Sequence, residues 1–204
     1  MIELLTQAND NRIPPAEWQR LLGKLPPDLR EAVARYRRWQ DRQATVLGKL
    51  LACRIAETAT GEQPSLSDLR ADEYRRPYWP QLPDFDFNIS HTAGMVICCG
   101  AVGAGRVGID VERVGEVDVT EFRRVFTEAE YGYLTSLADP ASEFYRLWTR
   151  KEAVMKADGR GFYLDPSGID CLAERVRIDG DLYTVRSLEL GLNYAAHLAK
   201  RDRA

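Results

Sequence analysis

Two short segments carry side chains suited to binding a divalent cation. The first, Gly-Ile-Asp-Val-Glu, ends at Glu112 and alternates like a β-strand, which places Asp110 and Glu112 on the same face. The second has helical spacing, because Trp148, Glu152 and Lys156 recur every four residues along one stripe. Where such a strand passes such a helix, three carboxylates and an ammonium group meet. These oxygen ligands suit a hard cation such as Mg²⁺, which shares its coordination shell with substrate phosphates.

Each of these residues also has an ordinary structural explanation. Acidic residues on a strand often form its solvent face. Glu152 and Lys156 have the spacing of an exposed helical salt bridge, worth roughly 0.3–0.5 kcal/mol. The indole of Trp148, however, suits the wall of a site better than a solvated face. Three carboxylates gathered without a cation would also raise one another's pKa and cost stability. We therefore predict that Asp110, Glu112 and Glu152 bind a metal ion.

A second candidate site lies where Ser90 and His91 end an expected strand. A turn over residues 91–94 would gather backbone N–H groups, a hydroxyl and an imidazole into an anion nest, although an ordinary turn is the alternative. The other histidine, His197, falls within an expected strand and is predicted to be structural. The arginine-rich stretch 30–42 is explained by default as a solvated helix face, and alternatively as a patch for phosphate or an acidic partner.

The elements that must position these residues form two similar series. The first series ends in strands, and the second begins with the strand that carries Asp110. Each series is a strand, then helices, then antiparallel strands, which predicts an α+β fold of two similar halves, residues 1–104 and 105–204. A seam between halves is a common place for a small-molecule site. From hydrophobic periodicity and Pro or Gly positions we expect strands at 2–6, 85–89, 95–102, 107–113, 174–178, 182–190 and 193–199, helices at 14–22, 27–38, 45–58, 127–138 and 140–157, and a long loop at 61–84.

Composition narrows the class of protein. The 204 residues have a net charge of −3, which argues against a general nucleic-acid binder. The sequence contains no apolar run near the roughly 18 residues of a membrane span, and its first residues lack the pattern of a signal peptide. The four cysteines have no Cys-x-x-Cys spacing, and the adjacent Cys98 and Cys99 are expected to pack on opposite faces of a strand. We expect a cytoplasmic protein that binds neither nucleic acid nor membrane.

The chain resembles the 4′-phosphopantetheinyl transferases of the long, surfactin-synthetase-activating type. The resemblance covers most of the chain, from Arg30 to Tyr163, and its motifs occur in the order found in that family. The last two acidic motifs are the hallmark of the family. The matching motifs are Tyr74-Arg75-Arg76-Pro77, Phe87-Asn88-Ile89-Ser90-His91, Gly108-Ile109-Asp110-Val111-Glu112, Phe126-Thr127-Glu128-Ala129-Glu130 and the segment from Trp148 to Lys156.

This resemblance implies a fold of two pseudo-symmetric α+β halves and a Mg²⁺-dependent transferase. Such an enzyme moves the 4′-phosphopantetheine arm of coenzyme A onto a serine of an apo acyl or peptidyl carrier protein and releases adenosine 3′,5′-bisphosphate. By resemblance, Asp110, Glu112 and Glu152 would hold Mg²⁺, and Lys156 would contact the pyrophosphate. Glu152 is the expected base for the carrier serine, directly or through a metal-bound water.

The resemblance also assigns the N-terminal half to the phosphates and adenine of coenzyme A. Ser90 and His91 would touch the phosphates, Arg76 would lie beside the nucleotide, and Thr45, expected at the start of its helix, would contact the 3′-phosphate. Arg75 stands where glycine is common in the family. Leu29 and Ala32 fall where some relatives carry lysine, so Arg30, Arg35 or Arg42 is the expected substitute at the 3′-phosphate.

Partners and alternatives follow from the same reading. Carrier proteins of this class are usually acidic around their serine, and Arg123, Arg124 and Phe126 are the candidates to receive them. The motifs do not choose among carriers of fatty-acid, polyketide and nonribosomal-peptide synthesis. We expect a monomer, since two halves on one chain suffice to build a site. The alternatives are a non-catalytic relative that binds coenzyme A or a carrier, and a Mg²⁺-dependent phosphohydrolase.

Overall fold

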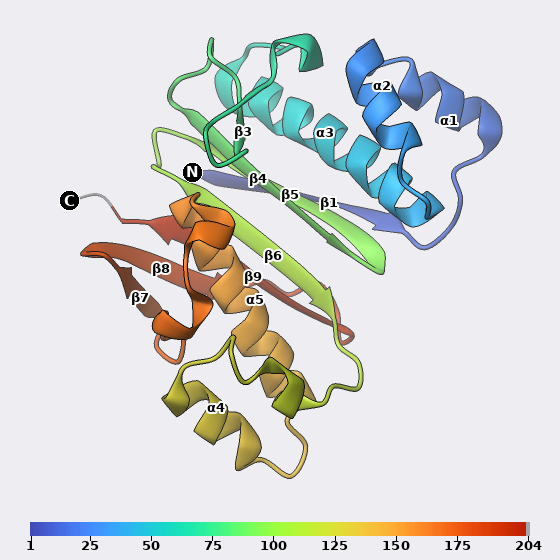
Figure 1. Ribbon diagram of the computed structural model, residues 1–204. Helices are drawn as coiled ribbons and strands as arrows, with labels where there is room; N and C mark the ends of the chain where they lie inside the picture. The colour runs from blue at the N-terminus through green and yellow to red at the C-terminus, as the bar shows by residue number, and fades with distance from the viewer. Residues whose placement is uncertain (203–204) are drawn as a thin grey trace. The chain divides into compact units, whose positions relative to one another are not determined.

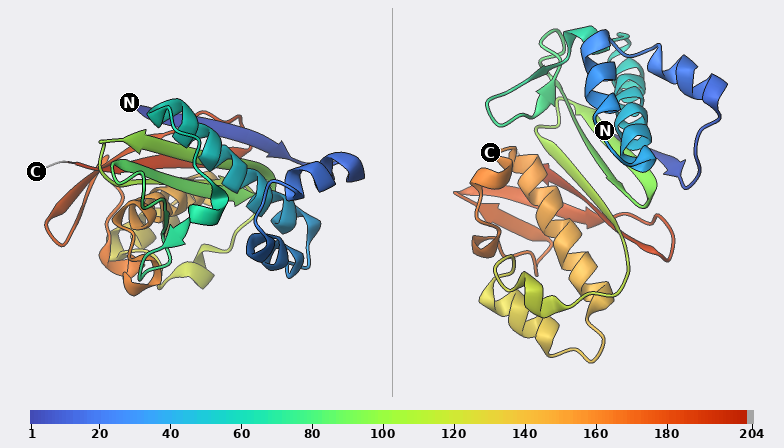
Figure 2. Two further views of the ribbon diagram at one scale, coloured as in Figure 1. Left: turned by 90° about the horizontal axis from the view of Figure 1, so that it is seen from above. Right: turned by 45° about the vertical axis from the view of Figure 1, so that its right-hand side comes forward.

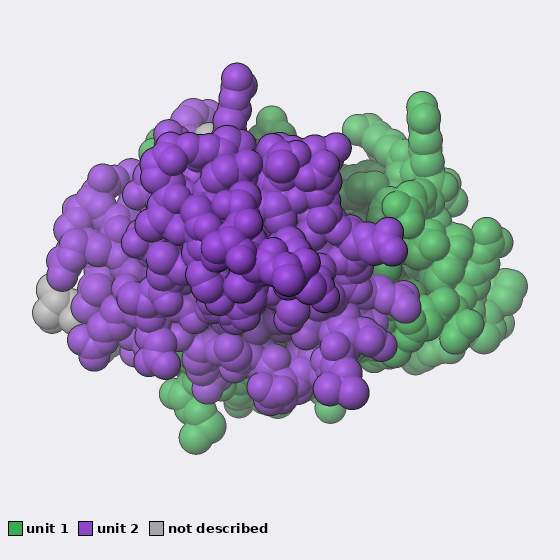
Figure 3. Space-filling model, turned by 90° about the horizontal axis from the view of Figure 1, so that it is seen from below, with its two compact units in different colours: residues 1–103 green, residues 104–204 purple. Residues whose placement is uncertain are grey.

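The computed structural model describes residues 1–202, and its backbone is drawn in Figure 1. Contacts along the chain divide it into two compact units, Met1–Gly103 and Ala104–Ala204, which are coloured separately in Figure 3. The boundary expected from the sequence lies between residues 104 and 105. Each unit has its own sheet and its own long helix, so each is described by itself.

Unit 1 is an antiparallel sheet, in the order β1-β5-β4, with helices packed against it. The first two helices begin with proline at the first helical position, where the missing N–H has no intrahelical acceptor to lose. The long helix ends at Gly61, whose φ of 77° is the left-handed conformation that terminates helices. The elements of unit 1 are β1 (Ile2–Asn9), α1 (Pro15–Leu22), α2 (Pro27–Ala34), α3 (Trp39–Thr60), η1 (Leu66–Asp68), β2 (Arg70–Ala71), β3 (Pro77–Tyr78), β4 (Phe85–Thr92) and β5 (Gly94–Val102).

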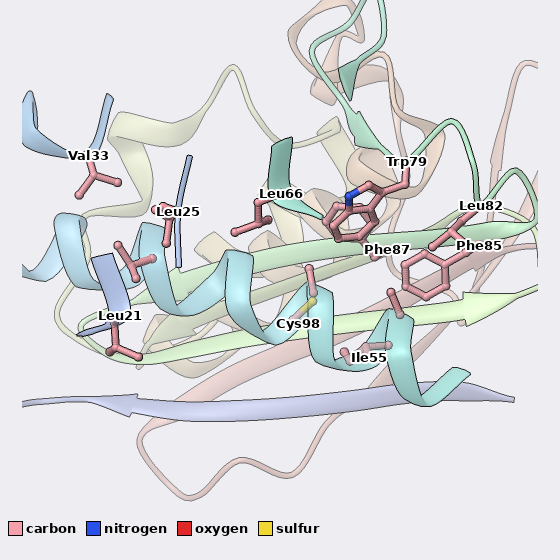
Figure 4. Packing of buried hydrophobic residues seen from close by; sticks show 13 residues of the cluster. Leu21, Leu25, Val33, Ile55, Leu66, Trp79, Leu82, Phe85, Phe87 and Cys98 are labelled. Carbon is pink, nitrogen blue, oxygen red and sulfur yellow. The ribbon is translucent and has the colours of Figure 1, made fainter. Parts of the chain in front are cut away.

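The core of unit 1 fills the space between α3 and the sheet. Figure 4 shows two gatherings of side chains along α3, with Leu21 and Val33 toward one end and the aromatic residues toward the other. The Trp79 ring lies 4.9 Å from the Phe87 ring and 6.2 Å from the Phe85 ring, centroid to centroid. Trp79 therefore anchors the segment between η1 and β4 to the sheet, although the sequence predicted a loop there.

Unit 2 is an antiparallel sheet, in the order β6-β9-β8-β7, with the long helix α5 lying along one face (Figures 1 and 2). The helix α4 begins with a capping box, in which Thr127 accepts from the backbone N–H of Glu130 and Glu130 accepts from that of Thr127. The elements are β6 (Val107–Arg113), η2 (Val119–Phe122), α4 (Glu128–Thr135), α5 (Ala141–Asp158), η3 (Gly161–Tyr163), η4 (Pro166–Gly168), β7 (Arg175–Ile178), β8 (Asp181–Ser187) and β9 (Tyr194–Arg201).

The two units share a topology, which confirms the α+β fold with two similar halves. In each unit the first strand pairs antiparallel with the last strand, β1 with β5 and β6 with β9. In each unit the longest helix, α3 or α5, packs on that strand pair. Unit 2 differs by its edge strand β7, which pairs with β8.

Two expectations about elements were wrong for identifiable reasons. Helix α3 begins at Trp39 and not at residue 45, because a polar side chain, Gln43, occupies its buried face and interrupts the apolar periodicity. The Gln43 amide donates to Asn9 Oδ1 at 2.9 Å and accepts from Ile13 N at 2.8 Å. Strand β4 continues through Thr92, which pairs with Met95, so His91 lies in a strand and not in a turn.

The helices and the cysteines can be compared with what composition predicted about membranes and thiols. Within residues 1–202 no helix is long and apolar enough to cross a membrane. The four cysteines are free thiols, with Cys98, Cys99 and Cys171 buried and Cys53 half-buried. Burial raises the pKa of the Cys53 thiol to about 11 and that of Cys99 to about 12, so these groups stay protonated at neutral pH.

Candidate active site

Strand β6 and helix α5 bring an acid and an ammonium group together. Asp110, on β6, is 4% exposed, and its Oδ1 lies 2.6 Å from Nζ of Lys156 on α5. The Lys156 ammonium also donates to the carbonyl oxygen of Ile109 at 3.3 Å. The strand and helix read from sequence therefore pack against each other through these side chains. The contact gives the Asp110 carboxylate a positive neighbour in a largely dry environment.

Glu152 belongs to the same electrostatic cluster. It lies one turn before Lys156 on α5 and is half-buried. Burial raises the pKa of Glu152, the Lys156 ammonium opposes that rise, and the Asp110 carboxylate adds to it. The charges of Asp110 and Lys156 thus both act on Glu152. We refer to these three residues as the acid–lysine cluster.

The third acid expected at a metal site, Glu112, lies two residues further along β6. Strand alternation puts it on the same face as Asp110, and it is half-buried opposite Ala195 of β9. Among residues 1–202, no group of three or more His, Cys, Asp or Glu side chains is arranged to hold a metal ion. In this structure the Lys156 ammonium contacts Asp110, and the role of the three carboxylates as metal ligands stays a prediction.

A buried ion pair, which the sequence did not suggest, holds α5 against α4. Lys151 Nζ lies 2.8 Å from Glu130 Oε2, and the two side chains are 1% and 0% exposed. Lys151 also donates to the carbonyl oxygens of Pro166 and Ile169, so its charge is fully engaged. The capping-box spacing of Thr127 and Glu130 was a readable signal for α4, but the pairing with Lys151 depends on tertiary packing.

A second set of contacts ties α5 to the sheet through His197. Its Nδ1 lies 2.8 Å from Thr149 Oγ1, and its Nε2 lies 3.0 Å from Ser187 Oγ. Thr149 donates its own hydroxyl hydrogen to the Tyr145 carbonyl, so its oxygen accepts from Nδ1–H, and Nε2 accepts from Ser187. Burial, with added repulsion from Arg150 and Arg146, lowers the pKa of His197 to about 3. This histidine is a neutral structural residue.

Trp148 supports α5 on another side. It is half-buried, and its ring lies 5.8 Å from that of Phe122 and 6.2 Å from that of Phe144, centroid to centroid. These rings belong to a cluster formed by η2, α4 and the first turns of α5. The indole thus packs η2 against α5.

In unit 1, Arg76 is held by a carboxylate. Its Nη2 donates to Asp86 Oδ2 at 2.6 Å and its Nε to Asp86 Oδ1 at 3.1 Å, a two-pronged pair in which the arginine side chain is 7% exposed. Arg75, where the family often has glycine, has a φ of 65°, in the left-handed region that glycine adopts most readily. The backbone at this position therefore adopts the conformation a glycine would favour.

The remaining coenzyme-contact candidates, Thr45, Ser90 and His91, lie in regular elements of unit 1. Thr45 lies in the second turn of α3, and its hydroxyl donates to the Asp41 carbonyl at 2.8 Å. Ser90 is buried and His91 is exposed, because consecutive residues of β4 point to opposite faces of the sheet. A single turn that presents both side chains to one anion is therefore not formed.

The arginine-rich stretch borders a pocket of unit 1 with a volume of about 450 Å³. Arg37, Arg38 and Arg42 line it together with Arg12 and Trp39. The guanidinium carbon of Arg12 lies 5.9 Å from the Trp39 ring centroid. Guanidinium groups beside an indole can hold a phosphorylated aromatic ligand.

The expected carrier-contact residues border a pocket of unit 2 with a volume of about 570 Å³. Arg123, Arg124 and Phe126 line it, together with Asp165 and others. Arg123 forms an ion pair with Glu128, and Phe126 is buried, so Arg124 is the residue whose side chain is most exposed among the three.

Comparison with known proteins places both units in one family. Residues 106–194 match the model of the 4′-phosphopantetheinyl transferase superfamily, and residues 13–103 match that of the 4′-phosphopantetheinyl transferase N-terminal region. The 4′-phosphopantetheinyl transferase of Bacillus subtilis strain 168 is 32% identical over 179 residues, which are 85% of this chain and 76% of that protein.

Two further relatives extend this similarity. A 4′-phosphopantetheinyl transferase of Aneurinibacillus migulanus is 34% identical over 80% of this chain and 68% of its own length. The L-aminoadipate-semialdehyde dehydrogenase-phosphopantetheinyl transferase of Schizosaccharomyces pombe is 28% identical over 72% of this chain and 63% of its own length. The region matched in unit 2 contains the acid–lysine cluster.

Proposed function

This chain belongs to the 4′-phosphopantetheinyl transferase superfamily, and on that premise we propose that it transfers the 4′-phosphopantetheine arm of coenzyme A to a serine of an apo carrier protein. The products are the holo carrier and adenosine 3′,5′-bisphosphate. The observation that carries the proposal is the contact of Asp110 with Lys156, beside Glu152, within the region shared with the family.

The carboxylates of unit 2 are suited to Mg²⁺. The Asp110 carboxylate acts on Glu152, and Glu112 follows Asp110 on the same face of β6. Mg²⁺ usually binds through one or two carboxylates together with substrate phosphates. We propose that Asp110, Glu112 and Glu152 hold it together with the diphosphate. When bound, the ion would neutralise charge on the equatorial oxygens during phosphoryl transfer.

Lys156 and Glu152 have separate roles in this proposal. Lys156 is 28% exposed at its side chain, so its ammonium can remain beside Asp110 while it donates to a diphosphate oxygen. Glu152 takes the proton of the carrier serine, directly or through a water molecule. The leaving group is a phosphate, which needs little help from an acid.

Binding of the coenzyme draws on unit 1 in the same proposal. Arg42, near the start of α3, replaces the lysines that some relatives carry for the 3′-phosphate, and Thr45 lies one turn further along. Ser90, His91 and Arg76 are proposed to contact the coenzyme phosphates and nucleotide. The carrier, which is acidic in this class, would dock beside Arg123, Arg124 and Phe126, and the protein would act as a monomer.

The test is labelling of a panel of apo carriers with fluorescent coenzyme A, with and without Mg²⁺. Asp110→Asn, Glu152→Gln and Lys156→Met should each lower turnover by roughly 10²–10³-fold, because each removes a group that acts on charge in the transition state. Glu143→Gln is the matched control, since Glu143 lies on α5 in an ion pair with Arg146 away from the cluster. The control variant should retain the turnover of the unmodified protein. The circular dichroism spectrum of every variant should match that of the unmodified protein.

The same assay separates the alternative functions. EDTA should stop transfer, and added Mg²⁺ should restore it. Cleavage of coenzyme A without any carrier would favour a phosphohydrolase instead. Binding of coenzyme A with no transfer to any carrier in the panel would favour a non-catalytic relative. Turnover like that of the unmodified protein in Asp110→Asn or Glu152→Gln would remove that residue from the active site.

A further inference from the structure

We infer that Gly108 is a positioning residue for the transfer reaction: its missing side chain lets the backbones of β6 and α5 touch, and this contact sets the spacing of the acid–lysine cluster. The inference rests on the proposed function, because it concerns the same cluster. Gly108 has a different role from a turn glycine, since it lies inside a strand and no positive φ is recorded there.

The evidence is the space around the Gly108 α-carbon. A β-carbon at this position would lie 2.9 Å from the carbonyl carbon of Lys156, and closer still to the Ala153 carbonyl oxygen and the Ala157 nitrogen. Carbon atoms in contact are normally about 3.5–4.0 Å apart. The three obstructing atoms belong to the backbone of one helix, so α5 would have to move as a unit, by about 1 Å.

The obstructing atoms adjoin the functional residues directly. Lys156 itself supplies one of them, and Glu152 immediately precedes Ala153 in α5. On the strand, Asp110 follows Gly108 by two positions and therefore points to the same face. A displacement of α5 at Gly108 therefore moves the backbone of Lys156, whose ammonium lies 2.6 Å from Asp110, together with that of Glu152.

Other contacts of α5 prevent the helix from simply tilting back into place. Lys151 is tied to Glu130, and Arg150 donates to the carbonyl oxygens of Cys171 and Ala173. Ala153 and Ala157 are both fully buried. The helix is therefore held from several sides, and a shift at Gly108 is expected to persist as an altered distance in the cluster.

Gly100, in β5 of unit 1, provides a matched control. A β-carbon there would lie 2.7 Å from Cγ2 of Ile55 and 2.9 Å from Cζ of Phe85. These obstructing atoms belong to side chains of α3 and β4 and not to the backbone of a helix, so the overpacking falls within the side-chain core of unit 1. Gly100→Ala therefore overfills a strand–helix contact of the same kind but leaves the acid–lysine cluster untouched.

The experiment compares Gly108→Ala and Gly100→Ala with the unmodified chain. Four quantities are measured. The first is the melting temperature of each protein. The others, measured below that temperature, are kcat for an apo carrier, KM for coenzyme A, and the affinity for Mn²⁺ in the presence of coenzyme A. Mn²⁺ replaces Mg²⁺ because its free form is detected directly by electron paramagnetic resonance. This last measurement reports on the carboxylates without depending on turnover.

We expect Gly108→Ala to lower kcat by roughly 100-fold, since a misplacement of about 1 Å in a catalytic group has an effect of that size. Its Mn²⁺ affinity should fall as well. Gly100→Ala should lower the melting temperature but keep kcat and Mn²⁺ affinity within about threefold of the unmodified protein. If Gly108→Ala does not fold, Ala157→Ser takes its place, a smaller enlargement beside the same contact, with the same direction of change expected.

Two results would overturn the inference. One is unchanged kcat and Mn²⁺ affinity in a folded Gly108→Ala protein. The other is an equal loss of both quantities in Gly100→Ala, which would indicate a general effect of overpacking. Failure of the proposed function has a different signature, because the unmodified chain would then transfer phosphopantetheine to no carrier.

Discussion

Replacement of Lys151 by methionine should destabilise unit 2 strongly, although Lys151 is not part of the acid–lysine cluster. The substitution keeps an unbranched apolar side chain that is one atom shorter, and it removes the charge. It leaves the Glu130 carboxylate at 0% exposure with its two backbone donors, Thr127 N at 2.9 Å and Cys171 N at 2.8 Å. It also removes the donor to the carbonyl oxygens of Pro166 and Ile169.

The magnitude follows from the burial of both partners. Removing one partner of a buried ion pair costs about 3–5 kcal/mol, because the remaining charge keeps its desolvation penalty without its counter-charge. Glu143→Gln is the comparison, since that pair with Arg146 has side chains 30% and 32% exposed. Breaking a pair of that kind costs about 1 kcal/mol or less. The double variant Glu130→Gln/Lys151→Met should lose less than the sum of its single variants, because no uncompensated charge remains.

Urea unfolding followed by far-ultraviolet circular dichroism measures these differences. Hydrogen exchange locates them, since amides of α5 should lose protection while those of α3 in unit 1 serve as an internal reference. A loss below about 1 kcal/mol in Lys151→Met, equal to that of Glu143→Gln, would refute the argument from burial. Strict additivity in the double variant would refute the claim that an unpaired charge causes the loss.

Two further predictions concern pH and the arginine of unit 1. His197 has a pKa of about 3 in the folded protein against an ordinary 6.5, so the unfolded chain binds more protons between these values and stability falls as pH drops. Between pH 7 and pH 5 the titration of His197 should lower the free energy of unfolding by about 2 kcal/mol. Urea unfolding at both pH values measures this drop, and the drop due to His197 should be absent in His197→Gln. Arg76→Lys should cost about 1.5–3 kcal/mol in the same assay, because an ammonium cannot reproduce the two-pronged contact with Asp86, and no change would contradict that reasoning.

Much of the local structure around the site was readable from residue order. Strand β6 and helix α5 follow from alternation and four-residue spacing, which are properties of neighbouring residues. The start of helix α3 was harder to predict, because Gln43 stands where an apolar residue is expected on its buried face. The Gln43 side-chain amide forms hydrogen bonds with Asn9 and Ile13. These partners lie far from Gln43 along the chain. The pattern of neighbouring residues therefore does not predict the hydrogen bonds that allow Gln43 to be buried.

Some features of the candidate active site could likewise be predicted from the sequence, and others depend on tertiary contacts. Residue order alone fixes which faces of β6 and α5 carry Asp110, Glu152 and Lys156, since side-chain direction depends on the backbone repeat. The three-dimensional fold was needed to show that Lys156 contacts Asp110, that Lys151 is buried against Glu130, and that Gly108 touches the backbone of α5. Those facts depend on how closely two elements approach, and that distance is set by the combined packing of side chains from both.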